Sequence, residues 1–210
     1  MFCKTALLLL ICLGSTFADC PAAWKTILNS QYKESEDNGC EPGWKFFNRP
    51  SGGWCMRVFA GFNAKKADAE KSCQAVGSTL SGIQNKNEAL YIQTALLAQI
   101  PQSSGSVWIG IQRTQKCLKQ KLTAACSALT AFEYTDKSVT GTDGFVFQKY
   151  QPDNSQLNQN CALLLASKTP TILNDQYFAA TLDDTNCDGM LEGDAARVLR
   201  GYICGKKADK

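Results

Sequence analysis

The pattern of apolar and polar positions becomes regular after Cys40 and begins with a predicted hairpin. Two aromatic-rich stretches, residues 44–47 and 54–59, have the composition of strands, and the turn-forming segment 48–53 lies between them. Cys40 and Cys55 stand where a disulfide can close this hairpin. We therefore expect the domain to open with two antiparallel strands.

Two helical stretches follow the hairpin. In the first, residues 64–76, Asn63 is a suitable N-terminal cap and Gly77 ends the pattern. Cys73 falls on the inward-facing side of this helix. A second helix is expected to begin at Asn87, because apolar residues then recur at helical spacing. These residues are Ala89, Ile92, Leu96 and Ile100.

After the helices the pattern is one of strands and turns. Residues 107–111 are apolar throughout and predict a buried strand. Residues 132–204 contain short extended pieces separated by Gly and Asp turns, and they end in a predicted strand at 201–204. Two helices and a set of short strands indicate an α+β fold. The chain length suits one domain preceded by an extension.

Residues 1–18 have the layout of a secretory signal peptide. Lys4 precedes the apolar run 6–13, and the small-residue segment 15–18 is typical of a cleavage site. The apolar run is shorter than the roughly 20 residues that a spanning helix needs, and no later stretch qualifies. We therefore expect a secreted, extracellular protein without a membrane span, whose mature chain starts at Asp19.

Secretion into an oxidising compartment favours disulfide formation by the cysteines. Of eleven, Cys3 and Cys12 leave with the signal peptide, and the nine that remain predict disulfides. Residues 19–39 form an N-terminal extension, which we interpret as a loosely attached arm. A short partner-binding helix is the alternative, because a few apolar residues of this segment are helically spaced.

Composition excludes several functions. The formal net charge is only +3, with Lys and Arg spread along the chain, so nucleic acid is not indicated. The chain has no histidine, which excludes Ser-His-Asp and Cys-His catalysis and His-ligated zinc. Asp183 and Asp184 are close acids, but neighbours on a strand point to opposite faces. We do not expect an enzyme.

Two runs of oxygen-bearing side chains are the candidate chemistry. They are Gln151-Pro152-Asp153-Asn154 and Leu182-Asp183-Asp184-Thr185-Asn186, and each lies near a cysteine. Calcium takes oxygen ligands, and acids beside amides also bind sugar hydroxyls, so a calcium-dependent binder is predicted. Residues 184–189 also match the first half of an EF-hand loop. Ala195 stands where that loop needs a glutamate, and we treat the match as coincidence.

A series of motifs runs through the chain in a characteristic order. The motifs are Cys40, Cys55, the helical Cys73, Trp108-Ile109-Gly110-Ile111, Gln151-Pro152-Asp153, Cys161, Cys187 and Cys204. Together they resemble the C-type lectin-like domain family over residues 40–207, and the chain is similar to the secreted single-domain lectins of nematodes. The resemblance implies an α+β fold of two helices, short antiparallel sheets and a long irregular loop region, stapled by disulfides.

The resemblance also implies a disulfide pairing. The pairs are Cys40–Cys55, Cys73–Cys204 and Cys161–Cys187, with Cys117 and Cys126 left as a local pair. Cys73–Cys204 closes the longest loop and restricts the unfolded chain by roughly 4 to 5 kcal/mol in the chain-entropy model. Cys20 lies outside this scheme. It indicates either a disulfide-linked homodimer through Cys20 or cleavage beyond it.

The local pair encloses an insertion that is rich in basic residues. We expect Arg113, Lys116, Lys119 and Lys121 to make it basic. A basic loop attracts anionic glycans or surfaces, whereas the alternative is an ordinary solvated loop face.

In lectins of the resembled family, residues at these positions hold calcium and sugar. The resemblance implies that the calcium ligands are Gln151, Asp153, Gln159, Asp183 and Asp184. It implies that Gln151, Asp153, Gln159 and Asp183 bind the sugar hydroxyls. The Gln-Pro-Asp order is associated with galactose-type sugars. Glycan recognition on microbes or other surfaces, as in innate immunity, is the implied role.

Two residues depart from the family pattern in ways that offset each other. Gln159 replaces the usual acid, whereas Asp183 replaces the usual asparagine, so the number of acids is unchanged. Leu182 replaces the usual tryptophan, and Tyr150 is the ring nearest to the site in sequence. The alternative is a calcium-independent lectin-like domain that binds a protein partner or has a structural role.

Overall fold

The computed structural model describes residues 38–61, 65–172, 176–189 and 195–209. The predicted signal peptide, Cys20 and nearly all of the N-terminal extension lie outside these residues, as does Asn63. The elements are β1 (Lys45–Arg49), β2 (Gly52–Ala60), α3 (Lys66–Gln74), β3 (Thr79–Leu80), α4 (Lys86–Leu97), β4 (Ser104–Arg113), β5 (Phe132–Tyr134), β6 (Cys161–Ser167), β7 (Thr171–Ile172), β8 (Tyr177–Phe178), β9 (Leu182–Thr185) and β10 (Leu199–Lys207), with 3-10 turns at Gln115–Cys117 and Ser155–Leu157.

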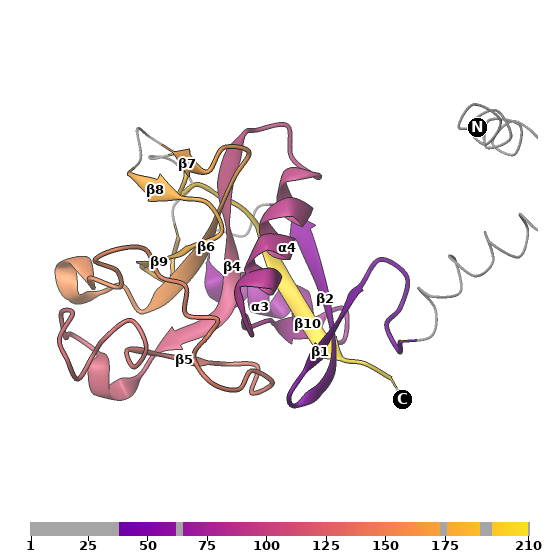
Figure 1. Cartoon of the computed structure of the whole chain (residues 1–210), viewed down its shortest axis with the longest axis horizontal. Helices are drawn as coiled ribbons and strands as arrows, with labels where there is room; N and C mark the ends of the chain where they lie inside the picture. The colour runs from indigo at the N-terminus through magenta and orange to yellow at the C-terminus, as the bar shows by residue number, and fades with distance from the viewer. Residues whose placement is uncertain (1–37, 62–64, 173–175, 190–194, 210) are drawn as a thin grey trace, which may run out of the picture.

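Most strands belong to one sheet. Its order is β1-β2-β10-β4-β6-β9, with β3 paired to β10 and β5 paired to β4. The β10–β4 pair is parallel and the other pairs are antiparallel. β7 and β8 form a separate two-stranded sheet. The last strand in sequence therefore lies in the middle of the large sheet, between β2 and β4 (Figure 1).

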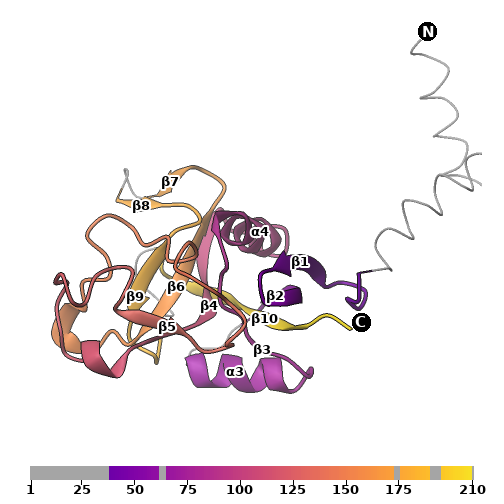
Figure 2. The ribbon, with the colours of Figure 1, turned by 60° about the horizontal axis from the view of Figure 1, so that its bottom comes forward.

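The two helices lie on opposite faces of this sheet (Figure 2). On β4, Val107, Ile109 and Ile111 belong to the same buried cluster as Ile92 of α4, whereas Trp108 belongs to the cluster of α3. The reason is that successive side chains of a strand point to opposite faces. The continuously apolar stretch predicted from the sequence is thus a strand that is covered on both sides. The expected α+β class is confirmed.

The predicted helices are present with shifted boundaries: α3 is shorter than the expected 64–76, and α4 ends at Leu97, before the expected Ile100. Asn85, and not Asn87, caps α4: its side-chain oxygen accepts from the backbone N–H of Asn87 at 3.0 Å and of Glu88 at 3.2 Å. An asparagine at either position is a suitable cap, and only the side-chain geometry decides between them. Gly77 follows α3 with a φ of +68°, a conformation that favours glycine at a helix end.

Within the described residues, four disulfides join the elements. Cys73–Cys204 links α3 to β10, Cys40–Cys55 ties the chain before β1 to β2, and Cys161–Cys187 links β6 to the turn after β9. Cys117–Cys126 closes a loop within the insertion. These are the pairs that the resemblance implied. Among the described residues, no helix has the length and apolar character needed to cross a membrane.

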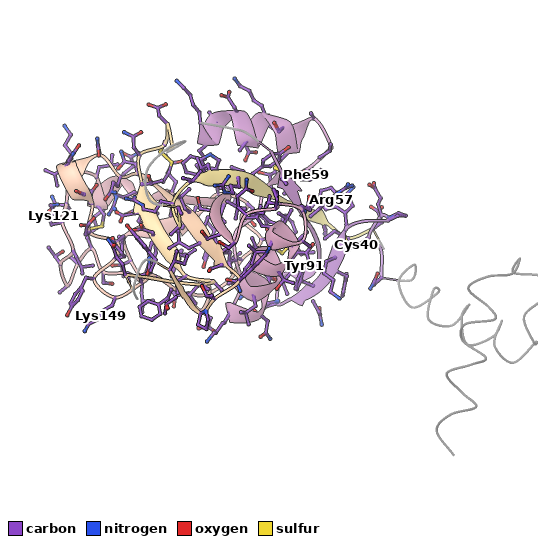
Figure 3. All side chains as sticks on the ribbon, turned by 90° about the horizontal axis from the view of Figure 1, so that it is seen from above. Cys40, Arg57, Phe59, Tyr91, Lys121 and Lys149 are labelled. Atoms are coloured by element: carbon purple, nitrogen blue, oxygen red, sulfur yellow. A yellow bond between two sulfur atoms is a disulfide. The ribbon has the colours of Figure 1, made fainter. Side chains whose placement is uncertain are left out.

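The long irregular region lies between β4 and β6. It contains β5 and the two 3-10 turns, and it gathers at the end of the molecule away from β1 and the C-terminal end of β10 (Figure 1). Viewed from above, Lys121 and Lys149 of this region lie at one end of the domain and Cys40 lies toward the other (Figure 3). Most of the loop region therefore lies at the end opposite to β1, but its residues Asp136 and Ser138 extend to β1, where both contact Arg49.

Candidate ligand-binding site

A pocket of about 530 Å³ lies among the loops beside β9 and β8. It is formed by three stretches that are distant in sequence: the loop before β6, the β8 strand, and β9 with the segment before β10. Its lining residues are Gln148, Lys149, Tyr150, Gln151, Asp153, Ser155, Gln159, Gln176, Tyr177, Phe178, Asp183 and Arg197.

Four of the five predicted site residues line this pocket, and the fifth does not. Gln151, Asp153, Gln159 and Asp183 are brought together there. Asp184 follows Asp183 on β9, so it points away from the pocket, toward the inside of the domain. Leu182 on the same strand is fully buried and packs into the main core.

Asp184 is held inside the domain by three donors. Its Oδ1 accepts from the backbone N–H of Asp153 at 3.1 Å, and its Oδ2 accepts from that of Asn154 at 2.9 Å. Oδ2 also pairs with the guanidinium of Arg113, and both side chains are almost completely buried. Burial raises the pKa of Asp184 to about 6, while the Asn154 N–H and the Arg113 charge oppose the rise.

Arg113 was expected in the exposed, basic insertion, and that expectation is wrong. The residue ends β4 and is only 2% exposed. Its Nε donates to the Gln159 carbonyl at 2.9 Å, and its guanidinium lies 4.6 Å from the centre of the Phe132 ring. Burial lowers the pKa of Arg113, and the nearby Asp184 carboxylate opposes the fall.

Asp183 has its own arginine, which the sequence analysis did not identify. Arg197, just before β10, places Nε 2.9 Å from Asp183 Oδ2 and donates through a terminal nitrogen to the Asp184 carbonyl at 3.0 Å. Burial raises the pKa of Asp183 to about 6, and the Arg197 charge opposes the rise. Arg197 thus contacts both residues of the acidic pair.

The remaining predicted residues are bonded within their own loop. Gln151 Oε1 accepts from the Asp153 N–H at 2.8 Å. Asp153 Oδ1 accepts from the Ser155 N–H at 2.9 Å, and Gln159 Oε1 accepts from the same N–H. The Gln151–Pro152 peptide bond is cis. The loop is therefore folded back on itself and presents its amides and Asp153 along the pocket wall.

This arrangement does not fit a calcium ion. Calcium takes six to eight oxygens, with carboxylates as the main charged ligands. Asp184 faces away with both of its oxygens engaged, and Asp183 is paired with Arg197. Across the described residues, no group of three or more acids or cysteines is placed to hold a metal. Of the three acids, Asp153 is the one that has no ion pair within the described part of the chain.

The pocket contains Tyr150, the ring that the sequence analysis placed nearest to the site, together with Phe178, Gln148 and Gln176, which the sequence did not indicate. Tyr150 is 72% exposed and Phe178 is 46% exposed, so two aromatic rings stand open at its edge. Gln148 Oε1 accepts from the Phe178 N–H at 2.9 Å, and Gln176 adds a further amide. These residues have no common sequence motif. Among the described contacts that bring them together are the pairing of β7 with β8, the isolated bridge from Phe147 to β9, and the Gln148 N–H that donates to the Leu182 carbonyl at 3.0 Å.

Comparison with known proteins decides the family. A family model described as C-type lectin domain-containing protein 141/158 matches residues 45–207. The chain belongs to this C-type lectin domain family. It is accordingly a binding protein and not an enzyme. A comparison with curated protein sequences found no match.

Several solved structures share the fold. The carbohydrate-recognition domain of the mouse scavenger receptor C-type lectin is 22% identical, with a TM-score of 0.50 over 81% of this chain and 100% of that one. The domain of cow CD23, solved in the presence of a GlcNAc2Man3 oligosaccharide, is 17% identical, with a TM-score of 0.51 over 82% and 99%. Herring type II antifreeze protein is 21% identical, with a TM-score of 0.50 over 81% and 100%. At these identities the likeness shows the fold alone.

Proposed function

We propose that this chain is a secreted carbohydrate-binding protein that binds its sugar by direct contacts in the pocket beside β9. The observation that carries the proposal is the composition of the pocket. It combines two exposed aromatic rings with the amides of four glutamines and one acid that has no ion pair among the described residues. We also propose recognition of microbial or surface glycans, the role that the family resemblance implies.

Each kind of group in the pocket suits a part of a sugar. The Oε1 atoms of Gln148, Gln151 and Gln159 already accept backbone N–H groups. This leaves their Nε2 groups to donate to a row of sugar hydroxyls and the second lone pair of each Oε1 to accept from one. Tyr150 and Phe178 offer apolar faces to the C–H side of a sugar ring, and an amphipathic ring suits such a half-wet position. Asp153 adds a charged acceptor, which makes stronger hydrogen bonds than a neutral one.

Calcium is left out of this mechanism because the donor set does not fit it. The sequence suggested a calcium-dependent, galactose-type lectin. Galactose remains the first sugar to test, since Gln151 and Asp153 keep the order that the resemblance associates with it. The proposal differs in that hydroxyls bind to the protein and not to an ion.

Secretion forms part of the same proposal. The signal-like residues 1–18 and the four disulfides of the domain suit an oxidising compartment. We propose mature residues from Asp19, a domain over residues 40–207, and a covalent homodimer through Cys20. Non-reducing mass spectrometry of the protein secreted by eukaryotic cells tests the mature start and the dimer, and limited proteolysis tests the domain bounds. Cys20 bonded to another cysteine of its own chain would contradict the dimer.

The experiment that tests the function is a glycan array with the secreted protein, in calcium and in EDTA, followed by titration calorimetry of the best glycan. We expect the same glycans to bind in both buffers with affinities that agree within error. Binding that is lost in EDTA would contradict direct recognition. No glycan binding in either buffer would contradict the carbohydrate proposal and favour a protein partner.

A further inference from the structure

We propose that Arg113 and Arg197 are built-in substitutes for a calcium ion: they neutralise Asp183 and Asp184 and fasten the loop 151–159 to β9. An ion held by the five predicted ligands would join the same two segments, because three ligands come from the loop and two from β9. This inference goes beyond the proposed function. Its test measures calcium binding and stability, so it can fail while sugar binding succeeds, and the reverse.

Arg113 connects the loop to β9. Its guanidinium pairs with Asp184 of β9, and its Nε donates to the Gln159 carbonyl of the loop at 2.9 Å. One side chain therefore bridges β4, β9 and the loop. Asp184 in turn accepts from the loop N–H groups of Asp153 and Asn154. The loop is thereby attached to β9 from both ends without an added ligand.

Arg197 neutralises the second acid of β9, Asp183. It pairs with Asp183 and also donates to the carbonyl of Asp184, so it contacts both members of the acidic pair. The carboxylate at Asp183 was the unexpected one, because the family pattern has an asparagine there. The structure gives this extra negative charge a partner, Arg197, whose side chain is only 17% exposed. The acid and the arginine thus form a matched pair.

The charges of the cluster show why an ion is not needed. Asp153, Asp183 and Asp184 contribute three negative charges, and the two guanidinium groups leave a net charge of −1. A buried carboxylate without a partner is strongly unfavourable, so some cation has to be present. With both arginines in place, a divalent cation would meet only Asp153 as an acid free of an ion pair among the described residues. Like-charge repulsion from the guanidinium groups opposes its entry.

The test is to remove one arginine and ask whether calcium binding appears. We expect the melting temperature of the wild-type protein to be the same in EDTA and in about 10 mM calcium. In Arg197→Gln, Asp183 loses its ion pair and becomes available, with Asp153 and the amides, as a calcium ligand. Calcium should then bind with a dissociation constant on the order of 0.1 to 1 mM, which is typical of extracellular sites. The ion should raise the melting temperature of this variant by about 3 to 10 °C.

Arg200 provides the matched control. It lies three residues further along, and its Nε donates to the Ser104 carbonyl at 3.0 Å and not to an acid. Arg200→Gln makes the same chemical change and should give no calcium response. The proposal is overturned if calcium stabilises the wild-type protein as much as Arg197→Gln. It is equally overturned if Arg197→Gln responds no more than Arg200→Gln.

A second variant covers the case in which Arg197→Gln does not fold. Asp183→Asn combined with Arg197→Gln removes both charges of this pair, so neither partner is left behind as an unpaired charge. We expect this double variant to fold and to melt at a higher temperature than either single variant, with no response to calcium because the acid is gone. A double variant that is no more stable than the single ones would show that the two residues are not coupled, which contradicts the proposal.

Discussion

Arg49 and Arg113 are two buried arginines that each lie over an aromatic ring, but they stabilise different parts of the molecule. Arg49 lies 5.1 Å from the centre of the Trp54 ring, and Arg113 lies 4.6 Å from that of Phe132. Arg49 forms a bidentate pair with Glu88 of α4, with N···O distances of 2.9 and 2.7 Å. It joins β1 to a helix, which is a contact of the scaffold.

The two arginine clusters differ in whether they leave an acid available to bind a ligand. Arg49 also approaches Asp136 at 3.4 Å and donates to the Gly82 carbonyl at 3.0 Å, so one arginine faces two acids in a closed interior. In the loop region, two arginines face three acids, and Asp153 remains at the pocket wall. Pairing of arginine with buried acids therefore closes the interior beside β1. Beside β9 the same kind of pairing supports an open recognition surface.

The largest expected effect comes from Arg49→Met. The change leaves the buried Glu88 and Asp136 carboxylates without their cation, which costs about 3 to 5 kcal/mol of unfolding free energy. Urea unfolding measures this loss. The affinity of the folded protein for its glycan should not change, because Arg49 does not line the pocket. Arg57→Met, at an exposed arginine over Phe59, is the control and should cost less than about 1 kcal/mol.

Arg113→Met should show that Arg113 and Arg49 have different roles. We expect a loss of about 3 kcal/mol in unfolding free energy, since Asp184 loses its cation. Unlike Arg49→Met, it should also weaken glycan binding, because Arg113 holds the Gln159 backbone next to the pocket. Calorimetry of the folded variant measures the second effect. If glycan affinity is unchanged, Arg113 belongs with Arg49 as a purely structural residue.

The scaffold end was predictable from sequence because its signals are local. Helical spacing, the hairpin and the apolar strand 107–111 each depend on neighbouring residues. The boundary of α4 was missed by two residues, since Asn85 and Asn87 are equally good caps by residue type. The pattern of two helices and short strands indicated the α+β class, and the family resemblance supplied the disulfide pairs, which spacing alone leaves undetermined.

The recognition end was only partly predictable. The motif residues Gln151, Asp153 and Asp183 do gather at one pocket, but their cation partners were not identified. A signal existed for Arg113: it lies two residues after Ile111, on the same face of β4 as the core residues, and an inward-facing arginine requires a buried acid. Arg197 and Phe178 have no such signal, because only the tertiary fold brings their segments beside β9.

A smaller effect is expected from opening the local disulfide of the recognition end. Replacing Cys117 and Cys126 by serine releases a loop with a sequence separation of 9, which costs about 2.5 kcal/mol in the chain-entropy model. The loop carbonyl of Gln120 accepts from the Asn154 side chain at 2.9 Å, so the change should also loosen the support of the pocket. Thermal unfolding and glycan titration measure the two effects. A stability loss without any loss of affinity would show that the insertion does not support the pocket.

The smallest expected change in stability comes from Tyr150→Ala, which acts on recognition alone. The side chain is 72% exposed, so the unfolding free energy should stay within about 0.5 kcal/mol of the wild-type value. Its φ of +69° is no harder for alanine than for tyrosine, because both carry a Cβ. Glycan affinity should fall about fivefold, equivalent to about 1 kcal/mol, if the ring stacks on the sugar. Calorimetry with the glycan found on the array measures this fall.

Two further variants show which part of Tyr150 is responsible. Tyr150→Phe keeps the ring and should keep the affinity, whereas a loss equal to that of Tyr150→Ala would assign the contact to the hydroxyl. Leu129→Ala removes an apolar side chain that is 53% exposed and does not line the pocket, so it should change neither stability nor affinity. If Tyr150→Ala binds as well as Leu129→Ala, the exposed ring is not part of the sugar site. The contrast between a closed scaffold and an open recognition end would then have to rest on the amides and Asp153.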